Sequence, residues 1–186
     1  MRFGVLVFGF VLTLPASAHA VDHALGIEIG PAGTSGSPCA NFSTNYDCDD
    51  SDQAFRLFYG LRVSEQFELR LGSTFFDVRL TDDVDPIFNA PSVSSSITDA
   101  ALLWRSPIND WVQWHAKGGL GYWEESRSGG AFLGGGDSSS GVVPLLGFGA
   151  ELGKGPLRFG LNLDAYPGAA ETDLLYFSSI GLQFIW

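Results

Sequence analysis

The sequence is poor in the residues on which metal centres and redox sites depend. Among 186 residues it has two cysteines, three histidines and one methionine. Eight residues separate Cys39 from Cys48, a spacing that matches no zinc motif. In an exported chain such a pair is expected to form a disulfide that closes a loop. We therefore expect no metal, no cofactor and no catalytic cysteine.

Basic residues are scarce as well. The sequence has ten lysines and arginines but 21 aspartates and glutamates, which gives a net charge of −11. An acidic chain of this kind repels phosphate backbones, so we expect no nucleic-acid partner.

Long apolar runs are absent, because no stretch reaches the roughly twenty residues that a membrane-spanning helix needs. The longest run lies in "MRFGVLVFGFVLTLPASAHA", where Arg2, an apolar segment and Ala18-His19-Ala20 match a secretory signal. We expect residues 1–20 to be removed after Ala20, leaving one domain over 21–186. The alternative is an N-terminal anchor helix. Loss of Arg2, the only charged residue of the segment, changes the net charge from −11 to −12.

Apolar residues instead recur with a period of two, which predicts strands. In "FRLFYGLRV", Phe55, Leu57 and Tyr59 share one face, and Arg56 and Arg62 share the other. The same alternation predicts eight strands, over residues 25–30, 55–63, 67–75, 98–105, 112–122, 144–152, 157–165 and 176–186.

The connections between these strands alternate in length. Long ones span 31–53, 77–95, 124–141 and 167–173, and short ones span 64–66, 106–110 and 153–156. This layout predicts an all-β, eight-stranded antiparallel up-and-down barrel, as in bacterial outer-membrane proteins.

The two faces of the predicted strands differ in charge. One face carries no charged residue, whereas the other carries charged residues and most of the strand glycines. So many large apolar side chains would overfill a narrow barrel, while small glycines leave space around charged groups. We therefore predict that the apolar face meets lipid, against the alternative of a soluble barrel with an apolar interior. The predicted lumen charges are Glu28, Arg56, Arg62, Glu68, Arg70, Asp99, Arg105, Lys117, Glu151, Arg158 and Asp164.

Aromatic residues gather near both ends of the predicted strands, which is typical of the aromatic girdles of membrane barrels. The predicted turn-side girdle contains Trp104, Trp111, Trp114, Phe184 and Trp186, and the loop-side girdle contains Phe55, Phe75, Tyr122 and Tyr176.

Two segments resemble the OmpA-like family of small outer-membrane barrels. "AFRLFYGLRVSEQFELRLGSTFFD" is similar to that family's second hairpin, and "GLQFIW" resembles its terminal assembly signal. The resemblance implies that Leu182, Phe184 and Trp186 are read by the barrel-assembly machinery. The family's last residue is usually Phe, and Trp186 departs from that pattern. Larger family members carry a peptidoglycan-binding domain, and we do not expect this chain to share that role.

The lumen charges nearly balance, six bases against five acids, which favours a network of ion pairs that plugs the barrel. We predict pairing of Arg70 with Glu68, Lys117 with Asp99, and Arg158 with Glu151 or Asp164. A passive pore is the first alternative. A lipid A-modifying enzyme is the second; His115 is its candidate histidine, but no serine is obviously paired with it.

The long loops are acidic, with runs such as "DCDDSD" and "DDVD", and neither run has the spacing of a calcium-binding EF-hand. The glycine-rich "GGAFLGGGDSSSG" lacks the strand–turn–helix context of a phosphate-binding loop. We therefore expect an integral outer-membrane protein of a Gram-negative bacterium with a structural or surface-interaction role. Its partners would be membrane lipid, the assembly machinery and an extracellular ligand at the loops.

Overall fold

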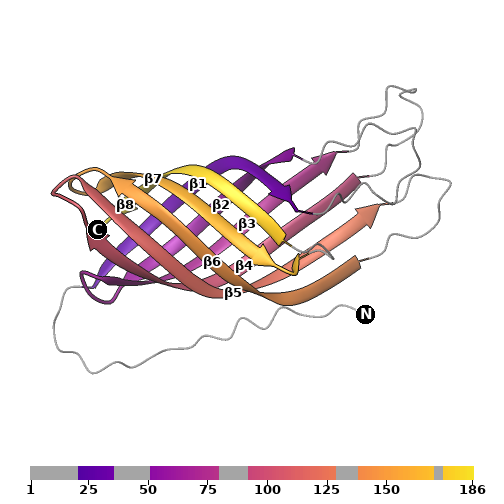
Figure 1. Ribbon diagram of the computed structural model, residues 1–186, viewed down its shortest axis with the longest axis horizontal. Coiled ribbons are helices and arrows are strands. Elements are labelled where there is room, and N and C mark those ends of the chain that lie inside the picture. The colour runs from indigo at the N-terminus through magenta and orange to yellow at the C-terminus, as the bar shows by residue number, and fades with distance from the viewer. Residues whose placement is uncertain (1–20, 36–50, 80–91, 129–137, 170–173) are drawn as a thin grey trace.

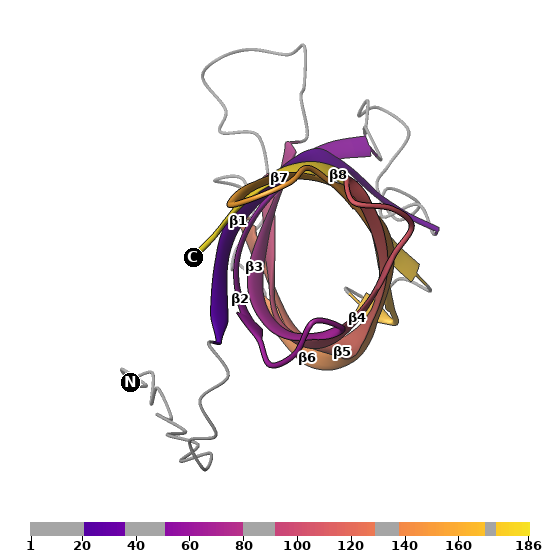
Figure 2. The same ribbon diagram turned by 90° about the vertical axis from the view of Figure 1, so that its left-hand side faces the viewer.

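Eight antiparallel strands form one sheet that closes when the last strand pairs with the first (Figure 1). The computed structural model describes residues 21–35, 51–79, 92–128, 138–169 and 174–186. The view turned by 90° shows the strands as a ring (Figure 2). Within the described residues, no helix is long and apolar enough to cross a membrane. The strands are β1 (Asp22–Thr34), β2 (Ser51–Arg62), β3 (Phe67–Arg79), β4 (Ser92–Pro107), β5 (Val112–Ser128), β6 (Ser138–Leu152), β7 (Leu157–Pro167) and β8 (Leu174–Ile185).

The predicted barrel and strand number are confirmed, but the predicted strand lengths are too short toward the loops. β1 has 13 residues where six were expected, and β4, β5 and β6 extend into segments expected to be loops. The extensions of β4 and β6 are rich in serine and lack the alternation of apolar and polar residues. Backbone hydrogen bonds can continue the ladder where neither face is strongly apolar, so hydrophobic periodicity does not reveal such strand ends.

The three short turns are held by local hydrogen bonds and glycine geometry. Between β2 and β3, the Ser64 hydroxyl accepts from the backbone N–H of Phe67 at 3.1 Å. Between β4 and β5, the Asn109 side chain accepts from the N–H of Trp111 at 2.8 Å, which is an Asx-turn, and from the N–H of Val112 at 2.9 Å. Between β6 and β7, Gly153 and Gly155 have φ of 134° and 92°, a conformation that other residues rarely adopt. These turns fix the register of three hairpins.

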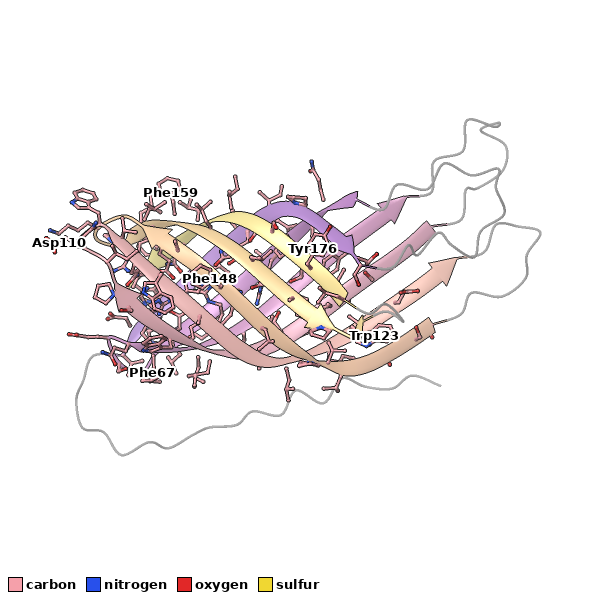
Figure 3. All side chains as sticks on the ribbon, in the orientation of Figure 1. Phe67, Asp110, Trp123, Phe148, Phe159 and Tyr176 are labelled. Carbon is pink, nitrogen blue, oxygen red and sulfur yellow. The ribbon has the colours of Figure 1, made fainter. Side chains whose placement is uncertain are left out.

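The polarity of the barrel is inside out relative to a soluble protein, as the strand pattern predicts. Arg56 and Arg70 are 0% and 2% exposed, whereas Leu57, Leu71 and Phe159 are 45%, 59% and 59% exposed. An apolar outer wall around a polar interior is the arrangement of a barrel surrounded by lipid. The side-chain view shows Phe159 projecting from the outer wall (Figure 3).

The closing contact between β1 and β8 continues to the end of the chain. The N–H of His23 donates to the carbonyl oxygen of Trp186 at 2.9 Å, and the N–H of Trp186 donates back to His23 at 3.0 Å. The His23 ring stacks on the Trp186 ring and lies 2.5 Å from the Tyr59 hydroxyl. Trp186 therefore extends the closing ladder, although β8 itself ends at Ile185.

Candidate functional site

The central part of the lumen holds five buried charged side chains, which we call the central cluster. The guanidinium of Arg56 donates to Asp164 and to Asp99, each at 2.5 Å. The Lys117 ammonium lies 2.7 Å from the same Asp164 carboxylate, and Glu28 is 4.0 Å from Arg56. All five residues are at most 4% exposed, so these charges have been removed from water and depend on one another.

The partner of Lys117 differs from the sequence prediction, which paired it with Asp99. Strand register gives the reason: Lys117 pairs with Gly147, and Gly147 pairs with Asp164, so the three residues form one row across β5, β6 and β7. Asp99 lies opposite Gly121 in β5 and is bound by Arg56. A Cβ on Gly147 would come within 2.4 Å of both Lys117 and Asp164. The glycine therefore makes the space in which this ion pair forms.

A second group of charges lies nearer the short turns, and we call it the turn-side cluster. It consists of Arg62, Glu68, Arg70, Arg105, Glu151 and Arg158. Arg70 donates to Glu68 at 2.9 Å, the same pair that the sequence predicts. Arg105 contacts both Glu68 and Glu151, the latter at 3.0 Å. Arg158 lies 3.6 Å from Glu151, one of its two expected partners.

The two clusters are continuous, and the exposure of the charges rises toward the turns. Arg70 links them, because its guanidinium lies 3.6 Å from Glu28 of the central cluster. It also lies over the ring of Phe58, 4.0 Å from the ring centroid, which is a cation–π contact. At the turn-side end, the side chains of Arg62 and Arg158 are 12% and 21% exposed. Water therefore reaches only the end of the network.

Apolar side chains fill most of the lumen on the loop side of the charges, and we call this group the apolar cap. Tyr166, Phe177 and Ile97 are at most 1% exposed. The Tyr166 hydroxyl donates to Asp99 at 3.2 Å and so joins the cap to the central cluster. The strand pattern predicts charges and glycines inside the barrel, but it does not predict this layer. The cap comprises Ala32, Ala54, Phe76, Ile97, Trp123, Val143, Leu145, Tyr166, Ala169, Leu175 and Phe177, while Ala101 and Leu103 of the same buried cluster lie between Asp99 and Arg105 on β4.

Little space remains between the two clusters. A cavity of about 10 Å³ is lined by Glu28, Arg70, Glu151, Asn162 and Gln183, among others. That volume suits about one water molecule. Asn162 donates to Glu28 at 3.1 Å, so amide side chains complete the network alongside the charges.

One inward acidic residue was missed because the sequence analysis assigned it to a loop. Glu125 is 7% exposed and faces the lumen side of β5, two residues beyond Trp123. The signal was present, since the inward period of β5 continues through Trp123 to Glu125. Among the side chains that the structure describes, the inward-facing acids with Glu125 included equal the six inward bases in number.

The predicted girdle residues all belong to the outer wall. Trp104, Trp111 and Trp186 are 42%, 63% and 55% exposed, and Trp104 packs edge-on against Trp114 with ring centroids 4.9 Å apart. On the loop side, Phe75 and Tyr176 are 50% and 41% exposed. Figure 3 shows Tyr176 toward the loop end and Asp110 at the turn end. The remaining terminal-signal residues, Leu182 and Phe184, also face outward, at 36% and 50% exposure.

His115, the candidate histidine of the enzyme alternative, is fully buried in the turn-side half of the lumen. Its Nδ1 atom lies 3.8 Å from Glu151, and neither ring nitrogen has a hydrogen-bond partner among the described residues. Within that part of the chain, no serine hydroxyl contacts it, and no group of three or more metal-ligating side chains occurs. The arrangement lacks the nucleophile–base contact that hydrolysis by a serine requires.

Several sequence predictions concern residues outside the described part of the chain. These are the signal segment 1–20, the disulfide between Cys39 and Cys48, the glycine-rich loop at 129–137 and most of the acidic loop residues.

The fold is shared with small outer-membrane barrels of known structure. Ail of Yersinia pestis, in complex with the heparin analogue sucrose octasulfate, aligns with a TM-score of 0.61 at 13% identity, covering 89% of this chain and 99% of Ail. Neisserial surface protein A aligns at 0.61 and 9% identity over 88% and 96% of the two chains. OprG of Pseudomonas aeruginosa aligns at 0.61 and 11% identity over 89% and 96%. No family model and no curated protein matches the sequence.

Proposed function

We propose that this chain is an integral outer-membrane barrel of the OmpA-like kind, with a sealed lumen and a structural or surface-interaction role. The observation that carries the proposal is the filling of the lumen. Buried ion pairs occupy its centre and turn side, and apolar side chains close its loop side. Hydrated ions would have to displace both layers to pass.

Support for the membrane location comes from the outer wall and from the neighbours in fold. Leu, Ile and Phe side chains cover the outside between two aromatic bands, which suits the hydrocarbon of a bilayer. Residues 1–20 fit a signal for export. Fractionation tests this location: the protein should enter solution from the membrane fraction only with detergent and should migrate faster on a gel when unheated. Recovery in a detergent-free periplasmic extract would instead support the soluble-barrel alternative.

A sealed lumen predicts no stable conductance in planar lipid bilayers. A variant with Arg56→Ala, Tyr166→Ala and Phe177→Ala removes large side chains from both layers, so it should show channel openings and demonstrate that the assay detects them. A wide, stable conductance of the unmodified protein would favour the passive-pore alternative.

The long connections between the strands are the proposed interacting part. Ail binds a heparin analogue in its crystal structure. The long connections of this chain are dominated by aspartate and glutamate. Negative charge repels sulfated ligands, so we propose that a ligand at this surface is neutral or cationic. Sulfated oligosaccharides should not bind to cells displaying the protein above the level of cells lacking it.

The terminal residues Leu182, Phe184 and Trp186 are proposed to be read by the barrel-assembly machinery. Their side chains lie on one outer face of β8 in alternation, so a partner could contact all three from one side.

A further inference from the structure

The barrel wall is taller on one side at its loop end. Strands β3, β4, β5 and β6 extend further toward the loops than β7 and β8 (Figure 1). In this extension, Phe75 pairs with Ser96, Ser96 with Glu124, and Glu124 with Ser140. The aromatic residue of this row belongs to the loop-side girdle. The extension therefore begins where the apolar outer wall ends.

The adjacent row, one residue nearer the loops, repeats the same order of residue types. Phe76 pairs with Ser95, Ser95 with Glu125, and Glu125 with Ser139. Two successive rows therefore have the order Phe, Ser, Glu, Ser across the same four strands. Because successive residues of a strand point to opposite faces, both faces of the extension present this combination.

A cleft of about 540 Å³ is lined by these two rows together with Ser126 and Ser138, and we call it the rim cleft. Its volume lies within the usual range of about 300–1,000 Å³ for small-molecule sites. Its outward-facing side chains are those of Phe75, Ser96, Glu124, Ser126, Ser138 and Ser140, whereas the row from Phe76 to Ser139 points inward, and none of the lining residues is basic. The ring of Phe75 is 50% exposed and adds an apolar surface.

These residue types have complementary hydrogen-bonding abilities. A serine hydroxyl both donates and accepts, which matches a ligand rich in hydroxyl groups. A carboxylate binds an ammonium group through a strong charge-assisted hydrogen bond and repels anions. An exposed aromatic ring can pack against the C–H face of a sugar ring. A hydroxyl-rich ligand that carries an amine satisfies all three.

We propose that the outward face of the rim cleft binds amino sugars with a free ammonium group, with Glu124 pairing to the ammonium and the four outward serines binding the hydroxyls. This site deepens the surface-interaction role and rests on the proposed exposure of the loop end outside the cell. The sugars could be free in the medium or attached to lipid of the same membrane, and the experiment below separates these sources.

The test is calorimetric titration of the folded barrel in phospholipid nanodiscs with a fully deacetylated glucosamine tetramer. The N-acetylated tetramer lacks the charge and should bind about tenfold more weakly, since one charge-assisted hydrogen bond is lost. A sulfated tetramer should not bind. The titration is repeated in nanodiscs that contain lipopolysaccharide. A weaker apparent affinity for the free tetramer there would identify lipid-borne sugars as the occupant of the cleft. An unchanged affinity for the tetramer would identify free glycans.

Matched variants locate the site. Glu124→Gln should weaken binding of the deacetylated tetramer about tenfold and remove its advantage over the acetylated one. Glu65→Gln, in the exposed turn between β2 and β3, removes the same charge at the opposite end and should change nothing. Ser140→Ala should also weaken binding, whereas Ser178→Ala, on β8 outside the cleft, should not.

The proposal is wrong if the tetramer does not bind to folded protein at millimolar concentration, or if Glu124→Gln and Glu65→Gln bind it equally. Native folding of each variant is checked by heat-modifiable gel migration. Neither failure affects the sealed-lumen proposal, because that is tested by conductance.

Discussion

Replacement of Asp164 by asparagine tests how far the central cluster holds the barrel together. The Asp164 carboxylate is fully buried and accepts from Arg56 at 2.5 Å and from Lys117 at 2.7 Å. Arg56 keeps Asp99 as a partner in the variant, but the Lys117 ammonium loses its closest counter-charge. Removal of one member of a buried ion pair costs about 3–5 kcal/mol, so Asp164→Asn should lower the free energy of unfolding by that amount.

The assay is urea-induced unfolding in lipid vesicles, followed by heat-modifiable gel migration, on a double-mutant cycle. Lys117→Met removes the charge that Asp164→Asn leaves unpaired. The double variant should therefore be more stable than the sum of the single effects predicts, by about 0.5–3 kcal/mol. Arg158→Gln, at the partly exposed turn-side end, is the control and should cost at most about 1 kcal/mol. A loss below about 1 kcal/mol for Asp164→Asn, or strict additivity with Lys117→Met, would show that Lys117 does not depend on Asp164.

Three further predictions concern the lumen, the outer wall and the end of the chain. Gly147→Ala places a methyl group 2.4 Å from two charged side chains and should lower the free energy of unfolding by about 1–3 kcal/mol in the same assay. Gly118→Ala is the control, because no heavy atom lies within 4 Å of its added Cβ, and it should leave stability nearly unchanged. Equal effects of the two substitutions would contradict the packing argument. Leu71→Arg puts a charge on the outer wall and should lower the free energy of unfolding in vesicles by about 2–4 kcal/mol. Ile108→Arg puts the same charge in a turn and should lower it by only about 0–1 kcal/mol. Similar losses for the two variants would argue against lipid around the strands. Trp186→Ala should slow the appearance of folded, heat-modifiable protein in cells. An unchanged rate would contradict the proposal that Trp186 is part of a terminal assembly signal.

The barrel could be predicted from the sequence because its strands repeat one simple rule, an apolar residue alternating with a polar or small one. Leu57, Leu71 and Phe159 face outward, and Arg56 and Arg70 face inward, as their alternation indicates. The same rule underestimates strand length toward the loops, where serine-rich segments on β4 and β6 carry little hydrophobic signal. Backbone pairing continues there without the apolar face that makes strands visible in a sequence.

The ion-pair partners were less predictable than the faces. Arg70 and Glu68 are two residues apart on one strand, so their side chains share a face and their contact follows from alternation alone. The contact of Lys117 with Asp164 depends on the register of β5, β6 and β7, which a strand pattern does not contain. Register also decides that Arg56 reaches two aspartates from different strands.

The apolar cap was missed for a related reason. Alternation places Phe177 on the same face as Gly181 and Gln183, but Tyr166 lies just beyond the predicted strand 157–165, and aromatic residues occur on both faces of these strands. Only the observed closure of β8 on β1 shows that they meet across the lumen with Phe76 and Ile97 in one buried layer. Individual strands thus indicate which way each residue faces, while the assembled barrel determines which residues meet.

The central claim is that the apolar face of every strand meets lipid while charges and the apolar cap fill the interior. Paramagnetic broadening of leucine methyl signals, in nanodiscs whose lipid chains carry nitroxides, tests it without any substitution. The outward Leu71 and Leu161 are 59% and 49% exposed, whereas Leu103 and Leu145 are fully buried in the lumen. The account predicts strong broadening of the first pair and sharp signals for the second. Broadening of Leu103 and Leu145 with sharp signals from Leu71 and Leu161 would contradict it.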